Sequence, residues 1–171
     1  MSEDSVVETS DESLKTLAMR TGKVLSGVGH RLVTAESCTG GGIMKTMTDI
    51  PGSSGWCEGG FITYTNRAKQ RLLDVPAETL VQQGAVSEEA VRAMAEGALA
   101  NSDGTLSVAV SGIAGPDGGS VAKPVGTVWL AWAEKEKGIQ TECCQFTGDR
   151  DAVRRQAIQR ALLGVIAMCR N

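Results

Sequence analysis

The chain has 171 residues, a length typical of one domain, and folding at this size can bury roughly 70% of the unfolded surface. Its 17 Lys and Arg against 20 Asp and Glu give a net charge of -3, which argues against a dedicated nucleic-acid-binding protein because such proteins usually carry a basic excess. No apolar run approaches the ~20 residues of a membrane helix, and the acidic, polar N-terminus does not read as a signal peptide. We therefore expect a cytoplasmic protein with neither a nucleic-acid nor a membrane partner.

The cysteines and the single histidine exclude several kinds of site. The five cysteines contain no C-x-x-C pair. Cys143 and Cys144 would point to opposite faces of a strand, so they cannot hold one metal ion together. Because His30 is the only histidine in the chain, a His-rich zinc site is impossible. The sequence predicts no metal and no cofactor.

The first half of the chain predicts alternating helices and strands. Residues 1–10 are acidic with little to bury, so we expect a disordered tail before a single domain over 11–171. Apolar residues at helical spacing predict a helix over 13–28, ended by Gly27 or Gly29. Further expected elements are a buried strand over 31–35, a helix over 43–48, a strand over 61–64 (FITY) after Gly59-Gly60, and a helical segment from Asn66.

The second half predicts the rest of the sheet. Ser87 is a natural N-cap for a strong helix, and a strand over 105–110 follows it. Residues 125–133 and 139–146 predict paired strands across a KEKG turn, and 149–168 predicts a long final helix. This order predicts an α/β fold with a mixed, mainly parallel sheet, in which helical crossovers make the parallel pairs and a hairpin adds antiparallel strands.

Two of three glycine clusters follow expected strands, in TAESCTGGG and SGIAGPDGG. Ligands of open α/β sheets bind outside the carboxyl ends of strands, where glycines let backbone amides approach closely. Neither cluster is a P-loop or a dinucleotide-binding fingerprint. They indicate either a ligand site or simply turn and cap glycines.

Ser37 lies at the junction of a strand and a helix, where it is either an N-cap or a nucleophile with backbone amides as oxyanion donors. Cys38 is a rival nucleophile, because a helix N-terminus stabilises a thiolate, or else a small buried apolar residue. His30 precedes the strand, and five extended residues span ~17 Å, so an imidazole base is out of reach. Lys69, near Tyr64, is the preferred base if burial lowers its pKa; otherwise it is a solvated helix residue.

The segment GDRDAVRR supplies a helix cap and a basic cluster. Asp149 can cap the final helix. Arg150 or Arg154 could clamp a phosphate, whereas Arg155 is better explained by surface salt bridges.

Six blocks of the sequence resemble the C-terminal domain of the CinA proteins in its stand-alone form. The blocks are TAESCTGG (34–41), PGSSGWCEGGFITYTNRAKQRLLDV (51–75), GAVSEE (84–89), SGIAGPDGGS (111–120), KPVGTVWLAWA (123–133) and FTGDRDAVR (146–154). The resemblance implies a three-layer α/β/α fold, a homodimer, and hydrolysis of the carboxamide of nicotinamide mononucleotide to nicotinate mononucleotide and ammonia, a step of NAD metabolism.

The resemblance also implies the roles of individual residues. The family's serine nucleophile, lysine and tyrosine correspond to Ser37, Lys69 and Tyr64. Backbone amides of the turn after Ser37 would hold the oxyanion, and two other segments would line the pocket and bind the nucleotide substrate and its phosphate. The oxyanion residues are Thr39, Gly40 and Gly41; the substrate residues are Ser111, Gly112, Gly115 and Arg150.

Two alternatives to a serine amidohydrolase stay open on the sequence. The chain could be a non-catalytic nucleotide-binding module in which Ser37 is only a cap. It could also be a thiol amidohydrolase that uses Cys38.

Overall fold

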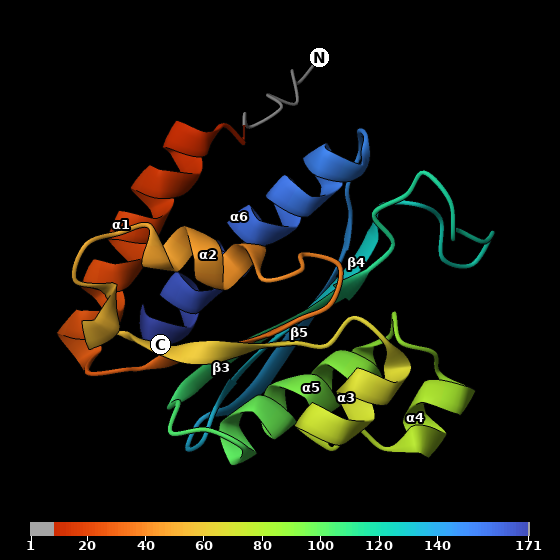
Figure 1. Ribbon diagram of the computed structural model, residues 1–171, viewed down its shortest axis with the longest axis horizontal. Coiled ribbons are helices and arrows are strands. Elements are labelled where there is room, and N and C mark those ends of the chain that lie inside the picture. The colour runs from red at the N-terminus through yellow and green to blue at the C-terminus, as the bar shows by residue number, and fades with distance from the viewer. Residues whose placement is uncertain (1–8, 171) are drawn as a thin grey trace.

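Helices and strands make up most of residues 9–170, the part of the chain that the computed structural model describes (Figure 1). The expected tail lies outside the described residues over 1–8, whereas Ser10 caps the first helix by accepting a hydrogen bond from the amide of Ser13. The elements in chain order are α1 (Asp11–Val28), β1 (Leu32–Glu36), α2 (Gly42–Thr48), the 3-10 turn η1 (Ser53–Gly55), β2 (Cys57–Ile62), α3 (Asn66–Leu73), α4 (Ala77–Gln82), α5 (Glu88–Ala100), β3 (Leu106–Gly112), β4 (Thr127–Glu134), β5 (Gly138–Gln145) and α6 (Arg150–Arg170).

The five strands form one mixed sheet in the order β2-β1-β3-β4-β5. β1 pairs in parallel with β2 and β3, and the hairpin β4–β5 adds two antiparallel pairings, so the predicted α/β class and mixed sheet are confirmed. At the end of β1, Glu36 is level with Ile62 of β2 and Val110 of β3. The segments that follow these three strands therefore meet at one edge of the sheet.

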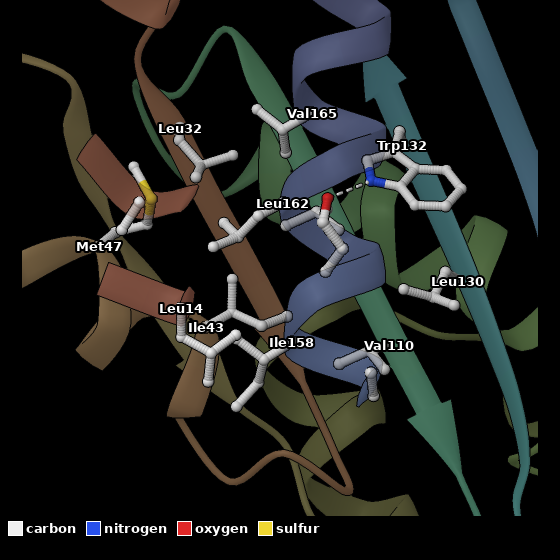
Figure 2. Packing of buried hydrophobic residues seen from close by; sticks show 14 of the residues in the cluster. Leu14, Leu32, Ile43, Met47, Val110, Leu130, Trp132, Ile158, Leu162 and Val165 are labelled. Carbon is white, nitrogen blue, oxygen red and sulfur yellow. Dashed lines mark hydrogen bonds between the residues drawn. The ribbon is translucent and has the colours of Figure 1, made fainter. Parts of the chain in front are cut away.

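Helices cover both faces of the sheet and make three layers (Figure 1). One face buries a cluster that includes Leu32, Val110 and Leu130 beneath α1, α2 and α6, and the other packs against α3, α4 and α5. In the first cluster the indole of Trp132 donates a hydrogen bond of 2.9 Å to the carbonyl of Ala161 in α6 (Figure 2). None of the helices within 9–170 is long and apolar enough to cross a bilayer.

Two elements differ from the sequence prediction. β2 begins at Cys57 rather than Phe61, because Gly59 and Gly60 lie inside the strand instead of before it. A Cβ at Gly60 would overlap the hydroxyl of Thr34 on β1, so the close approach of the two strands requires glycine there. The short helix α4 was not expected at all.

Candidate active site

The turn after β1 is organised by Glu36, a residue that the sequence analysis missed. Its carboxylate is fully buried and accepts hydrogen bonds from the Thr39 hydroxyl (2.6 Å) and from the amides of Gly41 (3.1 Å), Ile43 (3.0 Å) and Met44 (2.9 Å). Glu36 therefore satisfies the first amides of α2, the task that an N-cap would perform. Ser37 does not cap the helix, and its hydroxyl is left for another partner. A glutamate that ends a buried strand was the available sign in the sequence.

The glycines of the turn are required by its backbone. Gly40 and Gly41 have φ of 60° and 96°, in the left-handed region that favours glycine. A Cβ at Gly42 would lie 2.7 Å from Cδ1 of Ile158, so that residue lets α2 approach α6. The run of glycines is thus explained by turn geometry and packing.

The hydroxyl of Ser37 lies against the amine of Lys69. The Nζ of Lys69 is 2.9 Å from the Oγ of Ser37 and donates to the carbonyls of Thr63 (2.8 Å) and Tyr64 (3.2 Å). Lys69 is 1% exposed, and burial lowers the pKa of its ammonium to about 8. Within residues 9–170 no carboxylate pairs with it.

This environment fits a neutral amine. An ammonium has three N–H donors, whereas the neutral amine has two donors and one lone pair. The two carbonyls can take the two donors of the neutral form, which leaves the lone pair for the hydroxyl hydrogen of Ser37. The pair can therefore pass a proton directly from oxygen to nitrogen.

The parallel pairing of β1 and β2 brings these residues together across the sequence. β2 ends beside Glu36, and Thr65 then caps α3 by accepting from the amide of Ala68 at 3.1 Å. Lys69 lies one turn into α3, where the side chain reaches back over the end of β1. The sequence hypothesis that Lys69 approaches Ser37 is borne out by this contact.

A cavity of about 190 Å³ adjoins the pair. Its lining comes from the turn after β1, the β2–α3 segment, the α4–α5 loop, the end of β3 and the start of α6: Ser37, Cys38, Tyr64, Lys69, Ala85, Val86, Ser111, Gly112, Ala114 and Arg150. Ser111 is buried, and among the described residues nothing bonds to its hydroxyl. Ala85 and Val86 add an apolar wall that the sequence analysis did not anticipate. The cavity thus combines an apolar wall with a few polar groups, as ligand pockets do.

Tyr64 and Arg150 form the rim of this cavity. The Tyr64 side chain is 61% exposed, and its hydroxyl accepts from Nη2 of Arg150 at 3.1 Å. Nη1 of Arg150 donates to the carbonyl of Gly115 at 2.8 Å, so Gly115 anchors the arginine but does not line the cavity. Tyr64 contacts Lys69 through its backbone carbonyl, and its hydroxyl does not lie between Lys69 and Ser37.

The predicted oxyanion donors need correction. The amide of Gly40 donates to the carbonyl of Ser37 at 3.1 Å, and the amide of Gly41 donates to Glu36. These two amides are therefore already used inside the turn. Thr39 is fully buried and does not border the cavity. The remaining candidate is the amide of Cys38, a cavity residue whose N–H donates to no other residue within 9–170.

The alternative nucleophile and base are disfavoured by their surroundings. Burial, with Glu36 nearby, raises the pKa of the Cys38 thiol to about 11, so the thiol is protonated near neutral pH. His30 lies just before β1, at the other end of that strand from Ser37. There its Nδ1 is 2.9 Å from the Thr105 hydroxyl and its Nε2 is 3.5 Å from Glu134.

The charged residues at the start of α6 have four different roles. Asp149 caps α6 by accepting from the amide of Ala152 at 2.9 Å, as predicted. Arg155 forms surface ion pairs with Asp11 and Asp151, also as predicted. Arg150 borders the cavity, whereas Arg154 bonds the backbone of the turn after β1. Across residues 9–170 no group of three or more His, Cys, Asp or Glu is placed to hold a metal ion.

Known proteins match most of the chain. A family model, the CinA C-terminal domain, matches residues 14–169. The nicotinamide-nucleotide amidohydrolase PncC of Pseudomonas putida is 52% identical over 157 residues, which cover 92% of this chain and 98% of that protein. The protein of the same name from Escherichia coli K12 is 54% identical over 153 residues, covering 89% and 92%. The crystal structure of competence/damage inducible protein CihA from Agrobacterium tumefaciens aligns with a TM-score of 0.89 at 41% identity and covers 93% of this chain and 96% of that one.

Proposed function

Because the chain belongs to the CinA C-terminal domain family, we propose that it is an amidohydrolase that converts nicotinamide mononucleotide and water to nicotinate mononucleotide and ammonia. The observation that carries the proposal is the contact of 2.9 Å between Lys69 Nζ and Ser37 Oγ beside a cavity. A serine needs a base to become a nucleophile, and a buried lysine with a pKa of about 8 can act as one.

The reaction begins with neutral Lys69 taking the hydroxyl proton of Ser37 while Oγ attacks the carboxamide carbon. The carbonyl oxygen of the substrate becomes an oxyanion, to which the amide of Cys38 donates. The positively charged pyridinium ring withdraws electrons and makes this carbon more electrophilic. Loss of one oxyanion donor typically raises the barrier by ~2.7–4 kcal/mol.

The intermediate collapses when the Lys69 ammonium gives its proton to the departing nitrogen. The C–N bond breaks, ammonia leaves, and the acyl group stays as an ester on Ser37. Lys69, neutral again, then deprotonates a water molecule that attacks the ester. Nicotinate mononucleotide is released, and the proton returns to Ser37 Oγ.

The cavity supports a division of the substrate into a buried and an exposed part. Its volume of about 190 Å³ lies below the ~300–1,000 Å³ of pockets that enclose a whole drug-sized ligand. The carboxamide and its ring fit inside against Ala85 and Val86, while the ribose and phosphate lie at the mouth. At the mouth, Arg150 and the backbone of the loop after Ser111 bind the phosphate.

The experiment measures ammonia released from nicotinamide mononucleotide. We expect Ser37→Ala and Lys69→Ala each to lower kcat by more than roughly 1,000-fold with the fold retained. Cys38→Ala is the matched control, since it alters the adjacent residue and should keep near-normal turnover. If Ser37→Ala stayed active and Cys38→Ala did not, the thiol mechanism would replace this one. Thermal stabilisation by the nucleotide without ammonia release would instead favour the non-catalytic binding module.

The homodimer implied by the family is a separate proposal from the reaction. Light scattering of the purified protein tests it directly.

A further inference from the structure

The guanidinium of Arg154 donates hydrogen bonds to the turn that carries Ser37. Its Nε donates to the carbonyl of Cys38 at 3.1 Å, and its Nη2 donates to the carbonyl of Thr39 at 3.2 Å. Within residues 9–170 no carboxylate pairs with it, whereas its neighbour Arg155 pairs with two. Arg154 is half-buried and does not border the cavity. A cation with these partners is placed to fix the backbone rather than to bind a substrate.

The restraint that these two hydrogen bonds impose reaches Ser37 through planar peptide groups. In a trans peptide the C=O and the following N–H point in opposite directions, so fixing one fixes the other. The carbonyl of Thr39 shares its peptide with the amide of Gly40, which donates to the carbonyl of Ser37 at 3.1 Å. The bond to the carbonyl of Cys38 likewise fixes the peptide group between Cys38 and Thr39. Arg154 therefore acts on Ser37 through one peptide plane and one hydrogen bond.

The turn needs such external restraint because of its composition. Gly40, Gly41 and Gly42 have no side chains to limit the backbone, and glycine loses the most conformational freedom on folding. Glu36 restrains the turn by accepting from its amides. Arg154 restrains the same turn by donating to its carbonyls. Among the described residues it is the one side chain that donates to the carbonyls of Cys38 and Thr39.

We propose that Arg154 is a positioning residue that holds the turn of residues 37–41 so that Ser37 Oγ stays aligned with Lys69. Its kinetic consequence rests on the proposed amidohydrolase function. Displacement of a reacting group by ~1 Å can cost about 100-fold in rate, so the bonds need not touch the substrate to matter.

The kinetic test compares Arg154→Gln, Arg154→Lys and the surface control Arg155→Gln. We expect Arg154→Gln to lower kcat for ammonia release by about 100-fold with little change in KM. Arg154→Lys should restore part of the rate, because one ammonium keeps the charge but cannot bond two carbonyls in the same fork geometry. Arg155→Gln should leave both parameters unchanged.

A second readout does not depend on activity. The amides of Gly40, Gly41, Gly42 and Ile43 are all hydrogen-bonded within the turn, so they should exchange with solvent slowly. In Arg154→Gln we expect their exchange to be roughly 10-fold faster while amides of the sheet are unchanged. If the wild-type protein released no ammonia, the proposed function would fail, but this measurement would still decide whether Arg154 holds the turn.

Four results would overturn the inference. An unchanged kcat in Arg154→Gln, or unchanged exchange of the turn amides, would remove the positioning role. A raised KM with normal kcat would make Arg154 a phosphate ligand instead. A loss of kcat that follows a loss of global thermal stability, and that disappears on cooling, would make its role merely structural.

Discussion

At the scale of single residues, the proposed chemistry depends on the protonation state of Lys69. Its three hydrogen-bond partners are a hydroxyl and two carbonyls, none of which carries a charge that would compensate an ammonium. Burial penalises the charged form, so the pKa falls from its ordinary value of 10.5 to about 8. An ordinary lysine would be almost entirely protonated at neutral pH and could not accept the proton of Ser37.

The same residue sets a pH dependence of the rate. Since only neutral Lys69 can accept a proton, kcat/KM for ammonia release should rise with pH and level off above a midpoint of about 8. Initial rates in overlapping buffers between about pH 6 and about pH 10 measure this limb. A rate that is flat or falling through this interval would mean that a different group is the base.

At the scale of elements, local signals in the sequence predicted most of the fold. Ser87 and Asp149 cap their helices as expected, and the consecutive strands β4 and β5 form the expected hairpin, because these features depend on nearby residues. The start of β2 was wrong, because the need for Gly60 comes from Thr34 on a neighbouring strand.

In the candidate site, too, some features could be predicted from local sequence, whereas others depend on contacts made only in the folded chain. Ser37, Lys69 and Arg150 could be chosen from their residue types, their places at strand or helix ends and the family resemblance. The oxyanion donors could not, because they depend on which acceptor each amide finds. In the folded turn the buried Glu36 takes the amide of Gly41, and the carbonyl of Ser37 takes that of Gly40.

The packing of α6 on the sheet gives a prediction at this scale. A Cβ at Gly164 would overlap the indole of Trp132, so Gly164→Ala should lower the free energy of unfolding by ~1–3 kcal/mol despite its better helix propensity. Gly27 in α1 has nothing within 4 Å of its Cβ position, and Gly27→Ala should raise it by ~0.5–1 kcal/mol. Urea unfolding of both variants measures the two changes. A stabilised Gly164→Ala would show that α6 can shift away from Trp132 without cost.

At the scale of the whole molecule, the candidate active site joins the two helical layers across one edge of the sheet. Lys69 comes from α3 on one face, and Arg150 and Arg154 come from α6 on the other (Figure 1). Ser37 lies between them, after the strand that pairs with both β2 and β3. Burying Lys69 in this assembly therefore draws on the stability of the entire fold, which is a cost that activity imposes on many enzymes.

That cost has a defined pH dependence. Below a pH of about 8, Lys69 is protonated in the folded and the unfolded chain, and the full penalty of burying the ammonium applies. Between about 8 and the ordinary value of 10.5 the folded chain has released a proton that the unfolded chain retains, so stability rises with pH, by a total on the order of 3 kcal/mol. Lys69→Met has no amine to titrate and should lack this rise. The unfolding free energy of the wild type should therefore increase relative to that of Lys69→Met as the pH rises from about 8 to 10.5.

Urea unfolding at a series of pH values measures this difference. Ser37→Ala is the matched control, because it removes the proposed nucleophile but keeps the buried amine, and it should retain the rise. Parallel curves for Lys69→Met and wild type would mean that Lys69 keeps its ordinary pKa in the folded protein. In that case the amine would be too strongly protonated to serve as the base, and the proton transfer from Ser37 would need another acceptor.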